Sequence, residues 1–209
     1  MKQEYDTLKY YNENSENYFE QTKNADLSTC YNEFLKELPE KSYILDFGCG
    51  SGRDSKYFLE HGYKVRAIDG SSGMCDIATK YIGQKVECLK FSELSDINEY
   101  DGIWACSSIL HVEKQELPEI ITKMIKSLKQ NGVIYTSFKK GSTFEVKDGK
   151  YFNYTTKEDI EKILEKINLN AKIINYFETG SSTKRPGDNE VVWCNYIIKK
   201  YWKNKHFMV

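Results

Sequence analysis

Apolar residues follow two different spacings along most of this chain. Short runs rich in β-branched and aromatic residues, as expected for strands, occur at 43–47, 64–68, 86–90, 101–106 and 132–138. Amphipathic segments with helical spacing lie between most of these runs, at about 53–61, 73–82 and 115–129. Strands that alternate with helices in this way are typical of a parallel sheet, with right-handed crossovers and helices on both faces.

The two ends of the chain have a different pattern. Two helical segments, at about 8–21 and 27–38, precede the first strand, and Pro39 ends the second of them. After Gly149, a helix at about 156–168 leads to two strand-like runs, AKIINYFE and VVWCNYIIKK, which form an antiparallel hairpin. We therefore predict an α/β fold with a Rossmann-like doubly wound sheet and an N-terminal helical cap. The sheet is expected to be mostly parallel, with one antiparallel strand from the C-terminal hairpin.

Composition and charge are those of a globular protein without a strongly charged surface. The chain has 209 residues, of which 40% are hydrophobic and 29% charged, and its net charge is −1. This balance gives no field that would attract nucleic acid or an anionic membrane. No apolar run approaches the ~18 residues of a membrane span, and the N-terminal segment MKQEYDTLKYYNENSENYF is too polar for a secretory signal. We expect a cytoplasmic protein without a membrane partner.

Cysteine and histidine residues show no spacing typical of a metal site. The six cysteines contain no CxxC pair, and several lie in apolar runs where a reduced thiol behaves as a small hydrophobic group. His61, His111 and His206 are far apart in the sequence. We therefore expect free thiols and no bound metal.

A glycine-rich turn follows the first predicted strand, in the segment ILDFGCGSGRD at 44–54. Gly48, Gly50 and Gly52 lack a Cβ, so they permit a positive φ and a close approach of a ligand to the main chain. The helix that begins at about Arg53 directs free N–H groups and the positive end of its dipole to the same place. In open parallel sheets, ligands bind at this carboxyl edge of the strands.

Two classes of ligand use such a turn. A dinucleotide places its pyrophosphate there and requires a third glycine, in the pattern GxGxxG, where this chain has Arg53. Asp46, two residues before Gly48, would also repel a pyrophosphate, whereas it suits a ligand with an ammonium group. The turn therefore favours an amine-bearing ligand over a dinucleotide.

Asp69 ends the second predicted strand, in VRAIDGSSGM, 17 residues after Gly52. A carboxylate at this position can accept hydrogen bonds from both hydroxyls of a ribose. The alternative is that Asp69 is the N-cap of the helix at 73–82, and both roles can hold at once. A nucleoside with an amine and without phosphates describes S-adenosylmethionine.

Four segments in the same order and spacing resemble the class I S-adenosylmethionine-dependent methyltransferases: LDFGCGSGRDS, IDGSSGM, YDGIWACSSILHV and LKQNGVIYTSF. They are most similar to the small bacterial group that includes tellurite-resistance-type and other small-molecule methyltransferases. The resemblance covers residues 10–140, and the part from 150 onward matches in shape only. It implies S-adenosyl-L-methionine as cofactor and S-adenosyl-L-homocysteine as product.

The resemblance also implies roles for individual residues. The methionine part of the cofactor would be held by Asp46, Gly48, Cys49, Gly50 and Gly52. The ribose and adenine would be contacted by Asp69, Gly70, Ser71, Met74, Phe91 and Ser92. Many members have an acid near the adenine; Glu93 follows slightly later here, so this contact is either to Glu93 or to backbone. The sulfonium would face Cys106 and Ser107, with Leu110 and His111 just behind.

The N-terminal cap and Arg53 each have two interpretations. Tyr10, Tyr11, Tyr18 and Phe19 are predicted to share one side of a helix, which either packs on the sheet or forms a lid over the sulfonium. On the second interpretation, Tyr11 and Tyr18 contact the cofactor. Arg53 either reaches the cofactor carboxylate or pairs with an acid of the N-terminal segment.

Methyl transfer needs a base only when the acceptor atom carries a proton at neutral pH. His111 is the candidate catalytic base, because SSILHV places it just past the fourth strand; the alternative is a histidine that bonds to backbone or shapes the pocket. The acceptor would enter over a rim that contains Lys139, Lys140, Lys184 and Arg185. Such a basic rim hints at an anionic acceptor, although most surface lysines are simply solvated.

We therefore expect a single methyltransferase domain over 1–209, with a helical cap at 1–40, a cofactor-binding core at 41–140, a C-terminal helix and hairpin at 141–200 and a tail at 201–209. The expected activity is transfer of a methyl group to a small-molecule acceptor by in-line displacement, by a monomer or homodimer without a nucleic-acid partner. Two alternatives remain open: a tRNA or protein methyltransferase, and a non-catalytic regulator that binds S-adenosylmethionine. A nicotinamide-dependent oxidoreductase is disfavoured by Asp46 and Arg53.

Overall fold

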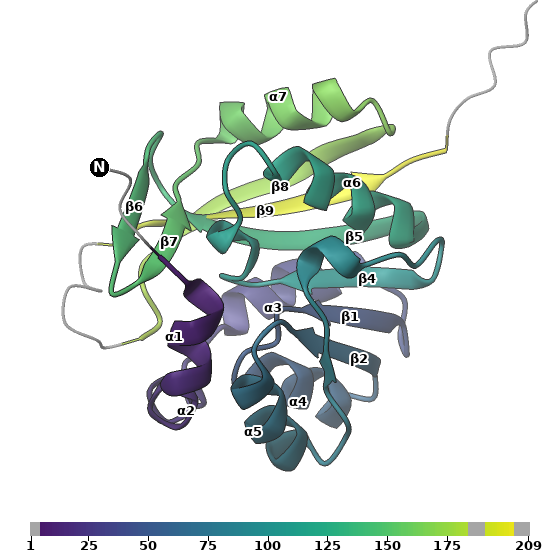
Figure 1. Cartoon of the computed structure of the whole chain (residues 1–209). Coiled ribbons are helices and arrows are strands. Elements are labelled where there is room, and N and C mark those ends of the chain that lie inside the picture. The colour runs from purple at the N-terminus through teal and green to yellow at the C-terminus, as the bar shows by residue number, and fades with distance from the viewer. Residues whose placement is uncertain (1–4, 184–190, 203–209) are drawn as a thin grey trace, which may run out of the picture.

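The computed structural model describes residues 5–183 and 191–202, and within these ranges seven strands form one sheet (Figure 1). The strands are β1 (Tyr43–Phe47), β2 (Lys64–Asp69), β3 (Glu87–Cys88), β4 (Tyr100–Ala105), β5 (Leu128–Lys139), β8 (Ala171–Thr179) and β9 (Trp193–Lys200). Their order across the sheet is β3-β2-β1-β4-β5-β9-β8. The first five are parallel, and β9 runs antiparallel between β5 and β8. The predicted doubly wound sheet with one reversed strand is confirmed.

Helices connect most of these strands. They are α1 (Thr7–Glu13), α2 (Ser15–Thr22), α3 (Ser28–Leu35), α4 (Arg53–Glu60), α5 (Ser72–Ile82), α6 (Leu117–Ser127) and α7 (Lys157–Ile167), with short 3₁₀ helices η1 (Phe91–Glu93) and η2 (Ile109–His111). No helix in the described part of the chain is long and apolar enough to cross a membrane.

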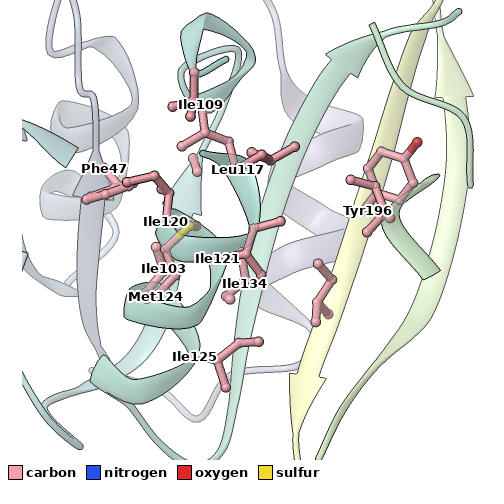
Figure 2. Packing of buried hydrophobic residues seen from close by; sticks show 14 of the residues in the cluster. Phe47, Ile103, Ile109, Leu117, Ile120, Ile121, Met124, Ile125, Ile134 and Tyr196 are labelled. Atoms are coloured by element: carbon pink, nitrogen blue, oxygen red, sulfur yellow. The ribbon is translucent and has the colours of Figure 1, made fainter. Parts of the chain in front are cut away.

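One face of the sheet is covered by α6 and α7. Ile120, Ile121 and Met124 of α6 pack against Ile103 of β4 and Ile134 of β5 (Figure 2). All five side chains are at least 96% buried. The apolar positions of α6 recur at helical spacing, so the stripe that identified this helix is also the surface that it buries.

The other face carries an aromatic core under α3 and α4. Phe34 of α3 and Phe58 of α4 pack around Trp104 of β4, whose indole stacks on Tyr135 with ring centroids 3.9 Å apart. Gly102 makes this packing possible, because a Cβ at that position would lie 2.7 Å from the Phe34 ring. Successive residues of β4 point to opposite faces, so Ile103 and Trp104 belong to different cores.

The cap differs from the prediction of one long helix at 8–21. Two short helices, α1 and α2, meet at Asn14, whose backbone (φ −118°, ψ 16°) is not helical. The Asn14 side-chain amide donates to the Tyr10 carbonyl at 2.9 Å, alongside the Asn14 backbone N–H at 3.0 Å. A short polar side chain that bonds to nearby backbone in this way favours a helix end over a helix interior.

A second, two-stranded sheet was not predicted. It consists of β6 (Phe144–Lys147) and β7 (Lys150–Asn153), joined by Asp148 and Gly149, both with positive φ (52° and 72°). An Asp-Gly pair between such runs is the sequence signal of a two-residue hairpin turn, so VKDGKY contained the information. This hairpin lies beside α1, and the Asp6 amide donates to the Gly149 carbonyl at 3.0 Å (Figure 1).

The close packing at Gly102 gives a test of the fold. We expect Gly102→Ala to lower the free energy of unfolding by about 1–3 kcal/mol, because the new methyl group overpacks the core against Phe34. Gly180→Ala, where a Cβ would meet nothing within 4 Å, should change stability by less than about 0.5 kcal/mol. Urea denaturation of both variants measures the difference, and equal midpoints would contradict the packing argument.

Candidate active site

A cavity of about 330 Å³ lies at the carboxyl ends of β1, β2 and β4, beneath α1 and α2. It is lined by most of the residues that the sequence singled out: Tyr11, Tyr18, Gly48, Cys49, Gly50, Arg53, Asp69, Gly70, Met74, Phe91, Ser92, Cys106, Ser107 and His111. Asp46, Gly52 and Ser71 do not line it. The structure therefore brings the sequence motifs together around one space, with three of the expected residues behind its wall.

The glycine turn forms the floor of this cavity. Gly48, Gly50 and Gly52 all have positive φ (83°, 53° and 77°). A Cβ on Gly48 would lie 2.6 Å from the Ser108 Cβ, so the turn and the segment after β4 meet only because glycine is there. Gly52 has a different role. A Cβ at this position would lie 3.0 Å from the Ile82 side chain, so glycine here allows α4 to pack on α5.

Asp69 connects the turn to the end of β2. Its carboxylate accepts hydrogen bonds from the backbone N–H groups of Gly50 (2.9 Å) and Ser71 (2.8 Å). Burial raises the pKa of Asp69, and these N–H donors oppose that rise. The N-cap of α5 is Ser71, whose Oγ accepts from the Met74 amide at 3.2 Å, so the alternative role of Asp69 as the N-cap was wrong.

Asp46 lies behind the turn, 2% exposed, and accepts a hydrogen bond from Ser55 Oγ at 2.6 Å. Burial raises its pKa to about 8, and the nearby negative charge of Asp54 adds to the rise. Asp46 therefore lies behind the glycine turn and does not line the cavity.

Arg53 and Asp54 form a buried ion pair at the start of α4. The guanidinium donates to both carboxylate oxygens of Asp54, from Nε at 2.6 Å and from Nη2 at 2.9 Å, and to the Thr22 carbonyl at 3.4 Å. Asp54 also accepts from the Tyr31 hydroxyl at 2.5 Å and from Trp104 Nε1 at 2.7 Å. Burial would raise the pKa of Asp54, but Arg53 and these donors hold it below its ordinary value.

The expectation that Arg53 pairs with an acid of the N-terminal segment was wrong among the described residues, since the paired acid, Asp54, belongs to α4. The guanidinium lines the cavity, so a contact with the cofactor carboxylate stays a prediction. The sequence did not indicate that Tyr31 and Trp104, from distant segments, converge on Asp54.

The cap contributes two tyrosines to the cavity. Tyr11 and Tyr18 pack edge to face with ring centroids 5.1 Å apart, and both line the space. Tyr10 instead lies under the Lys150 ammonium, 3.6 Å from it, and Phe19 packs against Tyr81. The expectation that all four aromatic residues share one side was wrong, because the chain breaks at Asn14 between the two pairs.

His111 lies at the end of η2 with both ring nitrogens engaged. Its Nδ1 is 2.7 Å from the Tyr151 carbonyl, and its Nε2 is 2.9 Å from the Tyr11 hydroxyl. Burial lowers the pKa of His111 to about 4, and Lys150 and Lys139 lower it further, while the bond to the Tyr151 carbonyl opposes the change. His111 therefore both bonds to backbone and faces the cavity, so the two interpretations of this residue are compatible.

The far wall of the cavity is formed by β5, β8 and β9, and the sequence did not indicate which of their residues would line it. It contains Ser137 of β5, Trp193 and Asn195 of β9, and Thr179 at the end of β8. Asn195 fixes this wall, because its amide donates to the Phe177 carbonyl and Thr179 Oγ1 at 3.1 Å each, and its oxygen accepts from the Tyr135 hydroxyl at 2.7 Å.

Two further expectations have partial outcomes. Glu93 accepts from the Lys90 amide at 2.7 Å and lies outside the cavity, whereas Glu116 of the segment before α6 lines it. Of the predicted basic rim, Lys139 pairs with Glu145 and Lys140 with Glu178, and Lys184 and Arg185 lie outside the described residues.

Within the described ranges, no three His, Cys, Asp or Glu side chains are grouped to hold a metal ion.

Comparison with known proteins finds similarity to methyltransferases in the core of the chain. Residues 44–132 match the methyltransferase domain family. The putative methyltransferase YqeM of Bacillus subtilis (strain 168) is 29% identical over 118 residues, 51% of this chain and 48% of that protein. The N-terminal Xaa-Pro-Lys N-methyltransferase 1 of Rattus norvegicus is 30% identical over 112 residues, 48% of this chain and 50% of that protein. The chain thus spans about half the length of these two relatives.

A solved structure matches over almost the whole fold. It is 1,6-didemethyltoxoflavin-N1-methyltransferase of Burkholderia thailandensis, with bound 1,6-didemethyltoxoflavin and S-adenosylhomocysteine. The TM-score is 0.71 at 16% identity, and the match covers 93% of this chain and 85% of that one. At this identity the likeness shows a shared fold, including the C-terminal strands that lie beyond residue 132.

The buried ion pair gives a prediction for stability. We expect Asp54→Asn to lower the free energy of unfolding by about 3–5 kcal/mol, because Arg53 would remain buried without its counter-charge. The matched control is Glu13→Gln, which removes the exposed partner of Lys9 and should cost less than about 0.5 kcal/mol. Chemical denaturation at neutral pH measures both, and a loss below 1 kcal/mol in Asp54→Asn would contradict the proposed weight of the pair.

Asp46 gives a prediction for pH dependence. Because its folded pKa of about 8 exceeds its ordinary value of 3.8, folding takes up a proton between these pH values. The stabilisation that protonated Asp46 contributes to the folded state is complete below about pH 4 and is lost as the pH rises through about 8. We expect the unfolding free energy of the wild type, relative to Asp46→Asn, to fall by up to about 1 kcal/mol per pH unit over that window. Parallel pH profiles of the two proteins would refute the raised pKa.

Proposed function

We propose that this chain is a class I S-adenosylmethionine-dependent methyltransferase that transfers a methyl group from this cofactor to a small-molecule acceptor, and the match of residues 44–132 to the methyltransferase domain family supports this. The observation that supports the proposal most is the joint lining of one capped cavity by the glycine turn, Asp69 and His111. These residues follow the carboxyl ends of β1, β2 and β4, which are parallel neighbours in the sheet.

The residues of the cavity fit this cofactor. Asp69 offers carboxylate lone pairs at the end of β2, and Gly48 and Gly50 expose backbone where a side chain would fill the space. Ser108 lines the cavity, and its buried Oγ has no hydrogen-bond partner among the described residues. A buried hydroxyl without a partner costs free energy unless a ligand or water satisfies it.

Each part of the cavity would hold one part of the cofactor. The glycine turn and Arg53 would hold the methionine part, Asp69 the ribose, and Met74 and Phe91 the adenine. Glu116, which lines the cavity, would contact the adenine in place of Glu93. When bound, the cofactor supplies an electrophilic methyl group for an in-line displacement, so the protein contributes mainly position and electrostatics.

The cap favours a small acceptor over a macromolecule. α1 and α2 cover the cavity, and Asn12 holds α1 to the start of α5, where its Oδ1 accepts from Ser71 Oγ at 2.8 Å and from the Gly73 amide at 3.2 Å. Gly73 lets the two segments approach, since a Cβ there would lie 3.0 Å from the Asn12 carbonyl oxygen. A protein or RNA acceptor would need this cap to move away. The rat relative is named as a protein N-methyltransferase, so a peptide acceptor is the second candidate and belongs in the acceptor screen.

Calorimetric titration with S-adenosylmethionine, S-adenosylhomocysteine and NAD tests the cofactor assignment. We expect the first two to bind and NAD not to bind. Asp69→Ala should weaken binding by about 10–100-fold, because charged hydrogen bonds to the ribose are lost. Asp76→Ala, an exposed carboxylate of α5 outside the cavity, is the matched control and should bind like the wild type. Binding of NAD alone would refute the proposal.

A further inference from the structure

Tyr11 and His111 form a hydrogen-bonded pair whose direction the structure fixes. The Tyr151 carbonyl can only accept, so the His111 nitrogen that lies 2.7 Å from it, Nδ1, carries the hydrogen. In the neutral ring Nε2 is then an acceptor, and the Tyr11 hydroxyl 2.9 Å away must donate to it. The pair thus has a phenol oxygen on the cavity side with a proton acceptor directly behind it.

The surroundings keep His111 neutral. Its ring is enclosed by Tyr11 of α1, by the Tyr151 carbonyl and Lys150 of β7, and by Lys139 of β5, and Phe152 packs on it with ring centroids 4.9 Å apart. The two lysines and burial all disfavour the imidazolium, and its pKa of about 4 means that Nε2 is free to accept a proton throughout the neutral range. An imidazolium formed during turnover would release its proton readily to water.

The part of the cavity wall built by β4, β5 and the C-terminal strands has no charged side chain among the described residues. It includes Ser107, Ser137, Thr179, Trp193 and Asn195. This lack of charge favours a neutral acceptor, and the Trp193 ring offers a surface on which an aromatic or heteroaromatic ring can stack. A weakly basic His111 further limits the acceptor to groups that give up a proton easily.

We propose that Tyr11 is a catalytic residue that receives the proton of an acidic O–H, S–H or azole N–H group on a neutral ring acceptor and passes its own proton to His111. The acceptor's X–H bond breaks and a new O–H bond forms at Tyr11 Oη. The former Tyr11 O–H bond breaks as an N–H bond forms at His111 Nε2. The electron pair of the X–H bond stays on the acceptor atom, which becomes the nucleophile. This relay rests on the proposed methyltransferase function and extends it to an acceptor class.

Because Tyr11 belongs to α1, the relay exists only when the cap is seated. The α1 helix is held by the bond from the Tyr151 amide to Thr7 Oγ1 at 3.2 Å, and the same residue's carbonyl orients His111. The unpredicted hairpin therefore positions both members of the relay through Tyr151. A free cap would leave His111 without its proton donor.

The first test observes the Tyr11–His111 pair by NMR, in the absence of methyl transfer. In protein with ¹⁵N-labelled histidine, saturated with S-adenosylhomocysteine, we expect His111 to be neutral with its hydrogen on Nδ1 from about pH 6 to 9. Comparison with His111→Gln identifies its signals. Tyr11→Phe should shift the Nε2 resonance, whereas the control Tyr10→Phe, a neighbouring tyrosine outside the cavity, should not. A hydrogen on Nε2, or no response to Tyr11→Phe, would overturn the relay.

The second test uses three probe acceptors that keep their proton at neutral pH: phenol, benzyl mercaptan and benzotriazole. We expect the wild type to methylate at least one of them. Tyr11→Phe and His111→Gln should each reduce kcat/KM by about 10²–10⁴-fold. The double variant should lose little more, because the two groups act as one unit. Tyr10→Phe should retain wild-type turnover.

The remaining outcomes separate the relay from the proposed function. Calorimetry must first show that all variants bind S-adenosylhomocysteine like the wild type; if the wild type does not bind it, the methyltransferase proposal itself fails. With binding intact, turnover of none of the probes would overturn the acceptor class. Turnover that Tyr11→Phe retains and His111→Gln loses would overturn the relay and make His111 the direct base.

Discussion

The hydrogen-bonded carboxylate of Asp54 is the interaction on which the arrangement of the site depends. It accepts from Arg53 of its own helix, from Tyr31 of α3 and from Trp104 of β4, and Arg53 reaches on to the carbonyl of Thr22 in the cap. Three segments far apart in sequence are thus fixed at one point beside the glycine turn. A buried carboxylate tolerates this position only because every partner is present, so the pieces of the site are formed together or not at all.

Close backbone approach is the second constraint, and it explains why glycine recurs around the cavity. Gly48 lets the turn meet the segment after β4, and Gly73 lets α1 lie on the start of α5. The first contact brings Ser108 and the Phe91 ring against the turn, and the second brings the Asn12 backbone against α5. The same feature that makes room for a ligand therefore also seats the cap above it.

On the proposed function, methyl transfer makes few demands on side chains. Two charged groups at the cavity are neutralised locally: Arg53 is paired with Asp54, and Asp69 accepts hydrogen bonds from backbone N–H groups. His111 is neutral because burial and two nearby lysines oppose its charge. On the proposed relay, such a site would select its acceptor mainly by shape and by the proton that must be removed.

The sequence by itself determined the parallel direction of the core strands, the reversed strand of the C-terminal hairpin and the glycine turn at residues 48–52. These features depend on local spacing and on the absence of a Cβ, which are visible in a single sequence. The sequence also contained the Asp-Gly signal of the β6–β7 hairpin, although this hairpin was not predicted. Only the tertiary structure decided that Asp46 lies behind the cavity, that Asp54 binds Tyr31 and Trp104, and that Tyr11 donates to His111. Each of these depends on residues at least 23 positions apart or on a depth of burial, and spacing along a chain carries no record of which distant side chains will meet.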